Sequence, residues 1–328
     1  MPEKQDKEAT ALREPPYLVV TVPCYNEEAV LGETSEVLAA KLEELIKAGQ
    51  VTAESSVLFI DDGSQDATWS IIERLHEANP IRFHGAKLAH NKGHQNALLA
   101  GLTLAYQNGE DVVVSMDADL QDDPNAIDEM VRDYREGVEI AYGVRDNRDA
   151  DTAFKRGTAH MFYKALSAMD TDIIPDHADF RLMSRKALAA LLNFREENLF
   201  LRGIVPSIGM EHAEVHYKRG ERHAGESKYP LHKMVSFAVE GITSFSTKPL
   251  TMITGLGIVS VIIGLIMLIY TVASVGMGHA VAGWGSMMVS LWLIGGFILL
   301  ALGVIGEYIA KIYQEVKHRP RFIIETTI

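Results

Sequence analysis

The N-terminal two thirds of the chain alternates between short apolar runs and longer segments in which apolar residues recur every three or four positions. The short runs predict strands and the longer segments predict helices. Strands are expected at 17–22, 57–60, 82–87, 111–116 and 139–143, and helices between them at 28–48, 68–78, 95–106 and 125–136. Strands that alternate with helices in this way predict an α/β domain with a mostly parallel sheet.

The last third has a different pattern. No Asp, Glu, Lys or Arg occurs from 249 to 306, and a glycine-rich link at 276–285 divides this block into apolar runs at 250–275 and 286–305. A helix needs about 20 apolar residues to cross a membrane. Each run is long enough, so the sequence predicts two transmembrane helices that form a hairpin, followed by a cytoplasmic basic tail at 307–328.

The flanking charges predict the orientation of this hairpin. Lys and Arg precede and follow the block but are absent from its link. Because positive charge stays on the cytoplasmic side of a membrane, we expect a cytoplasmic body at 16–228. Segment 229–248 mixes apolar residues with Lys and Ser, and it has two interpretations: an amphipathic helix on the membrane surface, or a plain connecting helix.

Composition narrows the possible functions. Lys+Arg 31 against Asp+Glu 44 gives a formal net charge of -13. A nucleic-acid-binding protein usually has a basic face, so we expect no nucleic-acid partner. The single cysteine, Cys24, excludes an intrachain disulfide and a cysteine-rich metal site. Residues 1–15 are polar, with no apolar run after their charges, and are expected to form a disordered leader rather than a signal peptide.

The strongest chemical signal follows the strand at 111–116. Asp117 and Asp119 share a face if the strand geometry persists, and Gln121 is then in phase with them. Two carboxylates together with phosphate oxygens suit Mg²⁺ or Mn²⁺. Asp122 and Asp123 are interpreted as turn and cap residues before the next helix.

Polar segments follow the other strands too. Ligands of parallel sheets bind beyond the carboxyl ends of the strands, where PCYNEE, DDGSQD, HNKGHQN and DADLQDD are expected to meet. Asp61 and Asp62 either cap a turn or accept hydrogen bonds from a nucleoside. Lys92 either approaches a diphosphate or is solvated. The histidines lack the spacing of a zinc site.

These segments together resemble glycosyltransferase family 2 with its GT-A fold, and within it the bacterial polyprenyl-phosphate glycosyltransferases related to dolichol-phosphate mannose synthase. The paired apolar runs match the bactoprenol glucosyltransferase branch. The matching segments are PCYNEE (23–28), FIDDGSQDAT (59–68), NKGHQNALLAG (91–101), MDADLQDDP (116–124), YGVRDNRDADTAFKR (142–156), DFRLMSRKAL (179–188) and AGESKYPLHKMVSFAVEGITSFSTKPL (224–250).

The resemblance implies a role for each matching residue. The sugar nucleotide is expected to carry UDP, and its nucleoside would be held by Pro23, Tyr25, Glu27, Asp61 and Asp62. Lys92 would lie near the bound nucleotide. The divalent metal, Mg²⁺ or Mn²⁺, would be held by Asp117, Asp119 and Gln121. The lipid phosphate would be surrounded by Arg145, Arg148 and Arg156. A mobile loop over the diphosphate would contribute Arg222, Ser227 and Lys228.

Asp179 is the expected base or acceptor-orienting carboxylate, and it would be catalytic together with Asp119 and Arg222. A buried structural role is the alternative for Asp179, and a surface salt bridge is the alternative for each Arg. Arginine suits phosphate because the planar guanidinium donates two parallel hydrogen bonds.

The implied activity is transfer of a hexose, glucose first, from a UDP-sugar to undecaprenyl phosphate with inversion, by a multi-pass protein of the bacterial plasma membrane. Formamido-arabinose, galactose and N-acetylglucosamine remain open as the sugar. A lipid-binding scaffold without activity is the alternative from another class. The resemblance also implies a homotetramer, and a flippase that acts on the product.

Overall fold

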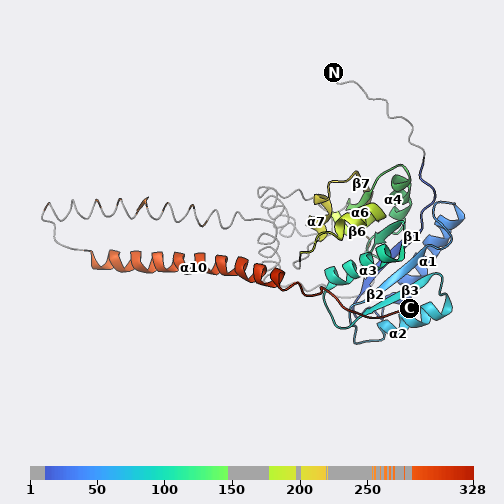
Figure 1. Cartoon of the computed structure of the whole chain (residues 1–328), viewed down its shortest axis with the longest axis horizontal. Coiled ribbons are helices and arrows are strands. Elements are labelled where there is room, and N and C mark those ends of the chain that lie inside the picture. Colours follow the sequence, from blue (N-terminus) through green and yellow to red (C-terminus); the bar gives the residue numbers. More distant parts are fainter. Residues whose placement is uncertain are drawn as a thin grey trace, which may run out of the picture. The chain divides into compact units, whose positions relative to one another are not determined.

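The computed structural model describes residues 12–146, 177–196, 201–218, 220 and 283–328, with scattered positions between 253 and 277. Its strands are β1 (Leu18–Cys24), β2 (Ser56–Asp61), β3 (Phe83–Leu88), β4 (Val112–Ser115), β5 (Ile140–Arg145), β6 (His177–Ser184), β7 (His212–Tyr217) and β8 (Ile324–Thr327). They form one sheet in the order β7-β5-β6-β4-β1-β2-β3-β8. Figure 1 labels β1, β2, β3, β6 and β7 of this sheet. Strands β3, β2, β1 and β4 run parallel, which confirms the predicted α/β class.

The helices are α1 (Leu31–Lys47), α2 (Thr68–Ala78), α3 (His94–Asn108), α4 (Ala126–Arg135), α6 (Arg185–Leu191), α7 (Leu201–Ser207) and α10 (Trp284–Val316). Every strand and helix predicted between 17 and 143 is present, with its ends shifted by a few residues. Periodicity predicts these elements well because the parallel strands are buried on both faces and therefore read as continuous apolar runs.

Helices cover both faces of the parallel strands. Alternate residues of β1 point to opposite faces: Leu18 and Val20 pack with apolar residues of α1, α2 and α4, whereas Val19 packs with residues of α3. Helix α3 approaches β1 very closely at Gly101, where a Cβ atom would lie 2.0 Å from Thr21 Oγ1. Glycine at this position therefore lets α3 lie against the strand and fixes the place of its first residues.

Strand β6 was not predicted. It lies between β4 and β5 and runs antiparallel to both. Its residues Asp179 and Arg181 are both buried, so charged side chains interrupt the apolar pattern that would mark a central strand. Burial of charge requires close pairing, and these two side chains form an ion pair that is described below.

Strand β8 was not predicted either, because the sequence indicated only a basic tail after 306. It pairs antiparallel with β3 and forms an edge of the sheet (Figure 1). Gly85 and Ile328 each donate a backbone hydrogen bond to the other, at 3.0 and 2.9 Å. The end of the chain is therefore part of the sheet.

The chain divides into two compact units: residues 1–164, 172–228 and 319–328 form the first, and residues 165–171 and 229–318 form the second. Within the second unit, α10 is a single helix of 33 residues. Its segment Ile294–Val316 is long and apolar enough to cross a membrane. The segment 229–248, the link and most of the run 250–275 lie outside the described residues, so the hairpin stays a prediction.

Candidate active site

The loops after β1 and β4 lie side by side because these two strands are neighbours in the sheet. From this pair, β2 and β3 extend to one side and β6 to the other. In open parallel sheets, ligands bind beyond the carboxyl ends of the strands at the place where the strand order reverses in this way, and we refer to this region as the crevice. The predicted nucleoside and metal residues lie in the loops on its two sides.

The loops after β1 and β2 hold each other. Asn26 donates its backbone N–H to Ser64 Oγ at 2.9 Å and accepts from the Gln65 N–H at 2.8 Å, while the Glu27 N–H bonds to Thr68 Oγ1 at 2.9 Å. These bonds fix the loop that carries Tyr25, whose side chain is 44% exposed. An exposed aromatic ring on a rigid loop is available to a planar ligand such as a nucleobase.

Asp61 and Asp62 at the end of β2 are both buried and have different partners. Asp61 Oδ1 accepts from the Ser64 N–H at 3.1 Å, as the turn interpretation requires, and its Oδ2 has no hydrogen-bond partner among the described residues. Asp62 accepts from the N–H groups of Lys92 and Gly93 at 2.7 and 2.8 Å. Burial raises the pKa of Asp62 although these two bonds lower it. Asp62 therefore shapes the loop before α3.

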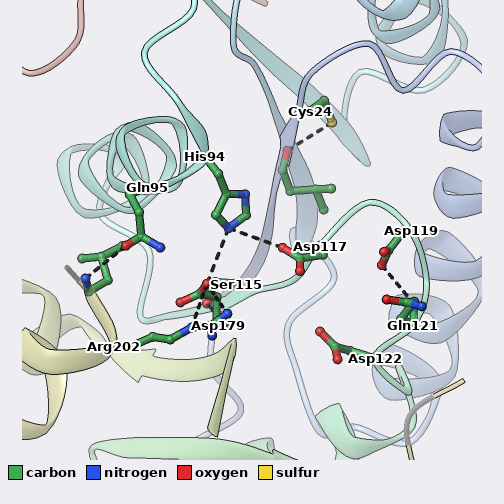
Figure 2. Close-up of polar contacts among 12 residues, drawn as sticks. Cys24, His94, Gln95, Ser115, Asp117, Asp119, Gln121, Asp122, Asp179 and Arg202 are labelled. Atoms are coloured by element: carbon green, nitrogen blue, oxygen red, sulfur yellow. Dashed lines mark hydrogen bonds and ion pairs between the residues drawn. The ribbon is translucent and has the colours of Figure 1, made fainter. Parts of the chain in front are cut away.

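The strand geometry on which the alignment of Asp117, Asp119 and Gln121 depended does not persist. Strand β4 ends at Ser115, before Asp117, and Leu120, between Asp119 and Gln121, has a φ of 51°, so the two-residue alternation of a strand does not continue to Gln121. Asp119 Oδ1 accepts from the Gln121 N–H at 3.2 Å. Figure 2 shows Asp119 and Gln121 on the opposite side of Asp117 from His94.

Residues 116–122, which follow β4, form a loop that we call the carboxylate loop. Neighbouring elements hold this loop at both ends. Thr34 of α1 donates from Oγ1 to the Ala118 carbonyl at 2.6 Å, and the Gly220 N–H donates to the Gln121 carbonyl at 2.8 Å. Gly220 follows β7 and precedes Arg222 by two residues. The chain just after β7 therefore contacts the carboxylate loop.

The interpretation of Asp122 as a turn or cap residue is wrong. Its carboxylate is buried and accepts from Arg145 Nη2 at 2.8 Å and from the Tyr217 hydroxyl at 2.5 Å. Asp123 does have the expected local role and accepts from the Asn125 N–H at 2.9 Å. Arg145, a predicted lipid-phosphate ligand, is thus held at the carboxylate loop by an ion pair.

His94, the first residue of α3, lies between two aspartates (Figure 2). Its Nε2 is 3.5 Å from Asp117 Oδ1 and 3.6 Å from Asp179 Oδ2. The side chain is 43% exposed, so its burial is only partial. Partial burial lowers the pKa of His94, but the nearby carboxylates of Asp179 and Asp117 outweigh this effect, so the pKa is raised. Burial also raises the pKa of Asp117, with a further rise from nearby carboxylates that His94 opposes.

Asp179 is buried and paired on both oxygens. Oδ1 accepts from Arg181 Nη2 at 2.7 Å, and Oδ2 accepts from Arg202 Nη2 at 2.9 Å. Burial raises its pKa, but His94 and the two arginines outweigh this, and the pKa is held well below its usual range. A carboxylate so strongly ionised is a poor proton acceptor. These contacts favour the structural alternative for Asp179 over the role of a base.

Sequence reasoning missed His94, Arg181 and Arg202. His94 lies in the segment HNKGHQN and Arg181 in DFRLMS, so both were present in motifs that had been singled out. A histidine that begins a helix is usually a solvated cap, and nothing in one sequence shows that it faces a carboxylate from another strand. The signal available in the sequence was the opposite charge of Asp179 and Arg181, which stand two residues apart in DFRLMS.

The residues of the carboxylate loop fit a divalent cation. Asp117 is surrounded by the negative charges of Asp119, Asp122 and Asp179, which raise its pKa. The described residues contain no cluster of three ligands that would hold a metal alone. This donor set suits Mg²⁺ or Mn²⁺, which take one or two carboxylates and complete their coordination with phosphate oxygens and water.

Five of the predicted phosphate-binding residues lie outside the described residues: Arg148, Arg156, Arg222, Ser227 and Lys228. Among the predicted residues that are described, those after β1, β2 and β4 meet at the crevice. Lys92 precedes α3, and its backbone N–H is bound by Asp62.

The parallel sheet, the crevice at its strand reversal and the carboxylate loop define a class of α/β enzymes that bind phosphorylated nucleotides. The family described as glycosyl transferase family 2 matches residues 19–192, from β1 through α6. The chain belongs to this family, and it is a glycosyltransferase with a GT-A-like fold.

Relatives match nearly the whole chain. The glycosyltransferase YkoT of Bacillus subtilis is 48% identical over 94% of this chain and 91% of its own length. The bactoprenol glucosyl transferase of Shigella phage SfV is 38% identical over 93% and 97%. A prophage bactoprenol glucosyl transferase homolog of Escherichia coli is 36% identical, also over 93% and 97%.

Proposed function

We propose that this protein transfers a hexose, with glucose as the first candidate, from a UDP-sugar to a polyprenyl phosphate at the cytoplasmic face of a bacterial membrane. The observation that carries this proposal is that proteins named bactoprenol glucosyl transferase match the chain over 93% of its length, through the carboxylate loop and the apolar helix alike. Formamido-arabinose, galactose and N-acetylglucosamine remain alternative sugars on the same lipid.

The crevice supplies the donor site. Tyr25 on its fixed loop would face the base, and Asp61, whose buried Oδ2 has no partner in the part of the chain that the structure describes, would accept a hydrogen bond from the nucleoside. Asp117 and Asp119, with Gln121, would hold a divalent cation, which when bound neutralises charge on the diphosphate. The segment after Gly220, with Arg222, Ser227 and Lys228, would add donors to the diphosphate oxygens as the leaving group separates.

The reaction needs one displacement. An oxygen of the acceptor phosphate attacks the anomeric carbon, the bond from that carbon to the β-phosphate oxygen breaks, and UDP leaves with the electron pair, so configuration inverts. The acceptor phosphate is already largely ionised at neutral pH, so no proton has to be removed. The ion pairs of Asp179 agree with this, because a carboxylate bound by two arginines is not placed to act as a base.

Helix α10 supports a site at the membrane. At 1.5 Å per residue its 33 residues extend roughly 50 Å, whereas the hydrocarbon core is about 30 Å thick. Large apolar side chains such as Leu291, Ile294 and Leu299 are all more than half exposed in the isolated chain. Lipid would cover this apolar surface. The second spanning helix, the homotetramer and the downstream flippase stay predictions.

Incubation of the purified full-length protein with a short polyprenyl phosphate and a panel of UDP-sugars tests the proposal. We expect a polyprenyl-monophosphate-sugar, formed from UDP-glucose faster than from the other donors. A faster reaction with another donor would replace glucose and keep the lipid acceptor. Tight lipid binding without transfer from any donor would contradict the enzyme and favour the scaffold.

A further inference from the structure

The carboxylate loop contacts a histidine from another element, and neither the family match nor the predicted motif assigns that histidine a role. We propose that His94 is a positioning residue, which sets the orientation of the Asp117 carboxylate toward a divalent cation. The inference rests on the proposed function in one respect only, namely that the carboxylate loop takes up such a cation.

The contact is directional. His94 Nε2 lies 3.5 Å from Asp117 Oδ1, and no contact with Oδ2 accompanies it among the described interactions. The ring therefore restrains one oxygen of the carboxylate and leaves the other without a described contact to the ring. A carboxylate on a loop otherwise rotates freely about its terminal torsion, which is broad and roughly two-fold.

His94 itself is held through its backbone. The residues immediately before it, Lys92 and Gly93, donate their N–H groups to the two oxygens of Asp62, at 2.7 and 2.8 Å. Gly93 has a φ of 85°, a left-handed conformation that glycine adopts without strain. Because Asp62 is buried at the end of β2, the start of α3 is tied to the sheet rather than to solvent.

A second carboxylate contacts the same ring nitrogen. The same Nε2 lies 3.6 Å from Asp179 Oδ2, and Arg181 and Arg202 fix that carboxylate on β6. Arg181, Asp179, His94 and Asp117 thus form a continuous chain of side-chain contacts. Removal of a side chain that contacts a metal ligand in this way typically weakens metal binding 10- to 100-fold.

The test is Mn²⁺ binding to the full-length protein, followed by electron paramagnetic resonance in the presence of UDP, without sugar or lipid. We expect His94→Ala to weaken Mn²⁺ binding about 10-fold or more. His94→Gln carries an amide donor at nearly the same reach, so it should restore binding to within about 3-fold of the wild type, whereas the shorter His94→Asn should resemble His94→Ala. A role in folding alone would not separate Gln from Asn.

His216→Ala is the matched control, because His216 also contacts two carboxylates, Asp146 at 2.8 Å and Glu214 at 3.7 Å. It should leave Mn²⁺ binding unchanged. Unchanged binding in His94→Ala, or equal weakening in His94→Gln and His94→Asn, would overturn the positioning role alone. Absence of Mn²⁺ binding by the wild type would overturn it together with the metal site of the proposed function, and a sugar transfer assay would then report separately on the rest of that function.

Discussion

Replacement of Asp179 by asparagine separates a structural role from a catalytic one. The substitution preserves the shape of the side chain and removes its charge. It leaves the Arg181 guanidinium, whose side chain is only 2% exposed, without the carboxylate that lies 2.7 Å away. Breaking a buried ion pair by removing one partner costs about 3–5 kcal/mol of the free energy of unfolding. For a body of this size we expect the melting temperature to fall by roughly 6–20 °C.

Thermal unfolding in detergent, monitored by tryptophan fluorescence, measures this loss. Asp123→Asn is the matched control because the Asp123 carboxylate accepts, among the described residues, only from Asn125, and its effect should be below about 1 kcal/mol. The double variant Asp179→Leu with Arg181→Met should lose less stability than the two single changes together, since it removes both buried charges.

The pH dependence gives a second readout. Because the pKa of Asp179 is held well below its usual range, the carboxylate is ionised in the folded protein at every pH above about 4. Its stabilising contribution is present at neutral pH and is lost as the pH falls through the lowered value. The transfer rate should therefore show no titration of Asp179 between pH 5.5 and 8.5. An Asp179→Asn protein that melts like the wild type but loses activity and changes its pH profile would refute this reasoning and support the role of Asp179 as a base.

Other parts of the body make similarly direct predictions. Gly101→Ala places a Cβ against Thr21 Oγ1 and should cost about 1–3 kcal/mol in the free energy of unfolding. Gly32→Ala has open space around its Cβ and should cost nothing. Chemical denaturation compares the two variants, and equal effects would contradict the close packing of α3. Burial raises the pKa of Glu110 to about 7, so the folded state loses stability as the pH rises from about 4.5 to 7. Glu110→Gln should therefore raise the melting temperature at pH 8, because it removes a penalty of at most about 3 kcal/mol, and should have little effect at pH 4.5. An equal shift of the melting temperature at pH 8 and pH 4.5 would contradict this account of Glu110. Deletion of 324–328 exposes the edge of β3 and should lower the free energy of unfolding by about 1–3 kcal/mol, and a deletion without effect would show that β8 adds no stability.

Most of the parallel half of the sheet could be predicted from the sequence because its strands are buried on both faces and its helices have one apolar side. The strands that were missed have weaker local signals. In β6 the ion pair of Asp179 and Arg181 interrupts the apolar run. Strand β8 is short and mostly exposed, and only its pairing with β3, far away in the sequence, makes it a strand.

The candidate site shows the same division. The sequence indicated the loop that carries Asp117 and Asp119, because an acidic segment after an apolar strand is a local pattern. The contacts of Asp117 with His94 and of Asp122 with Arg145 join different elements and have no local pattern. The left-handed turn at Leu120, between Asp119 and Gln121, also has no local pattern in the sequence.

The central claim is tested most directly by mass spectrometry of the lipid product formed from polyprenyl phosphate and UDP-glucose, with and without Mg²⁺ or Mn²⁺. We expect a polyprenyl-monophosphate-hexose that requires the metal and disappears in Asp119→Asn. Metal-independent product that Asp119→Asn forms at the wild-type rate would contradict the role of the carboxylate loop. Absence of any glycolipid from every sugar nucleotide offered would contradict the proposed transfer itself.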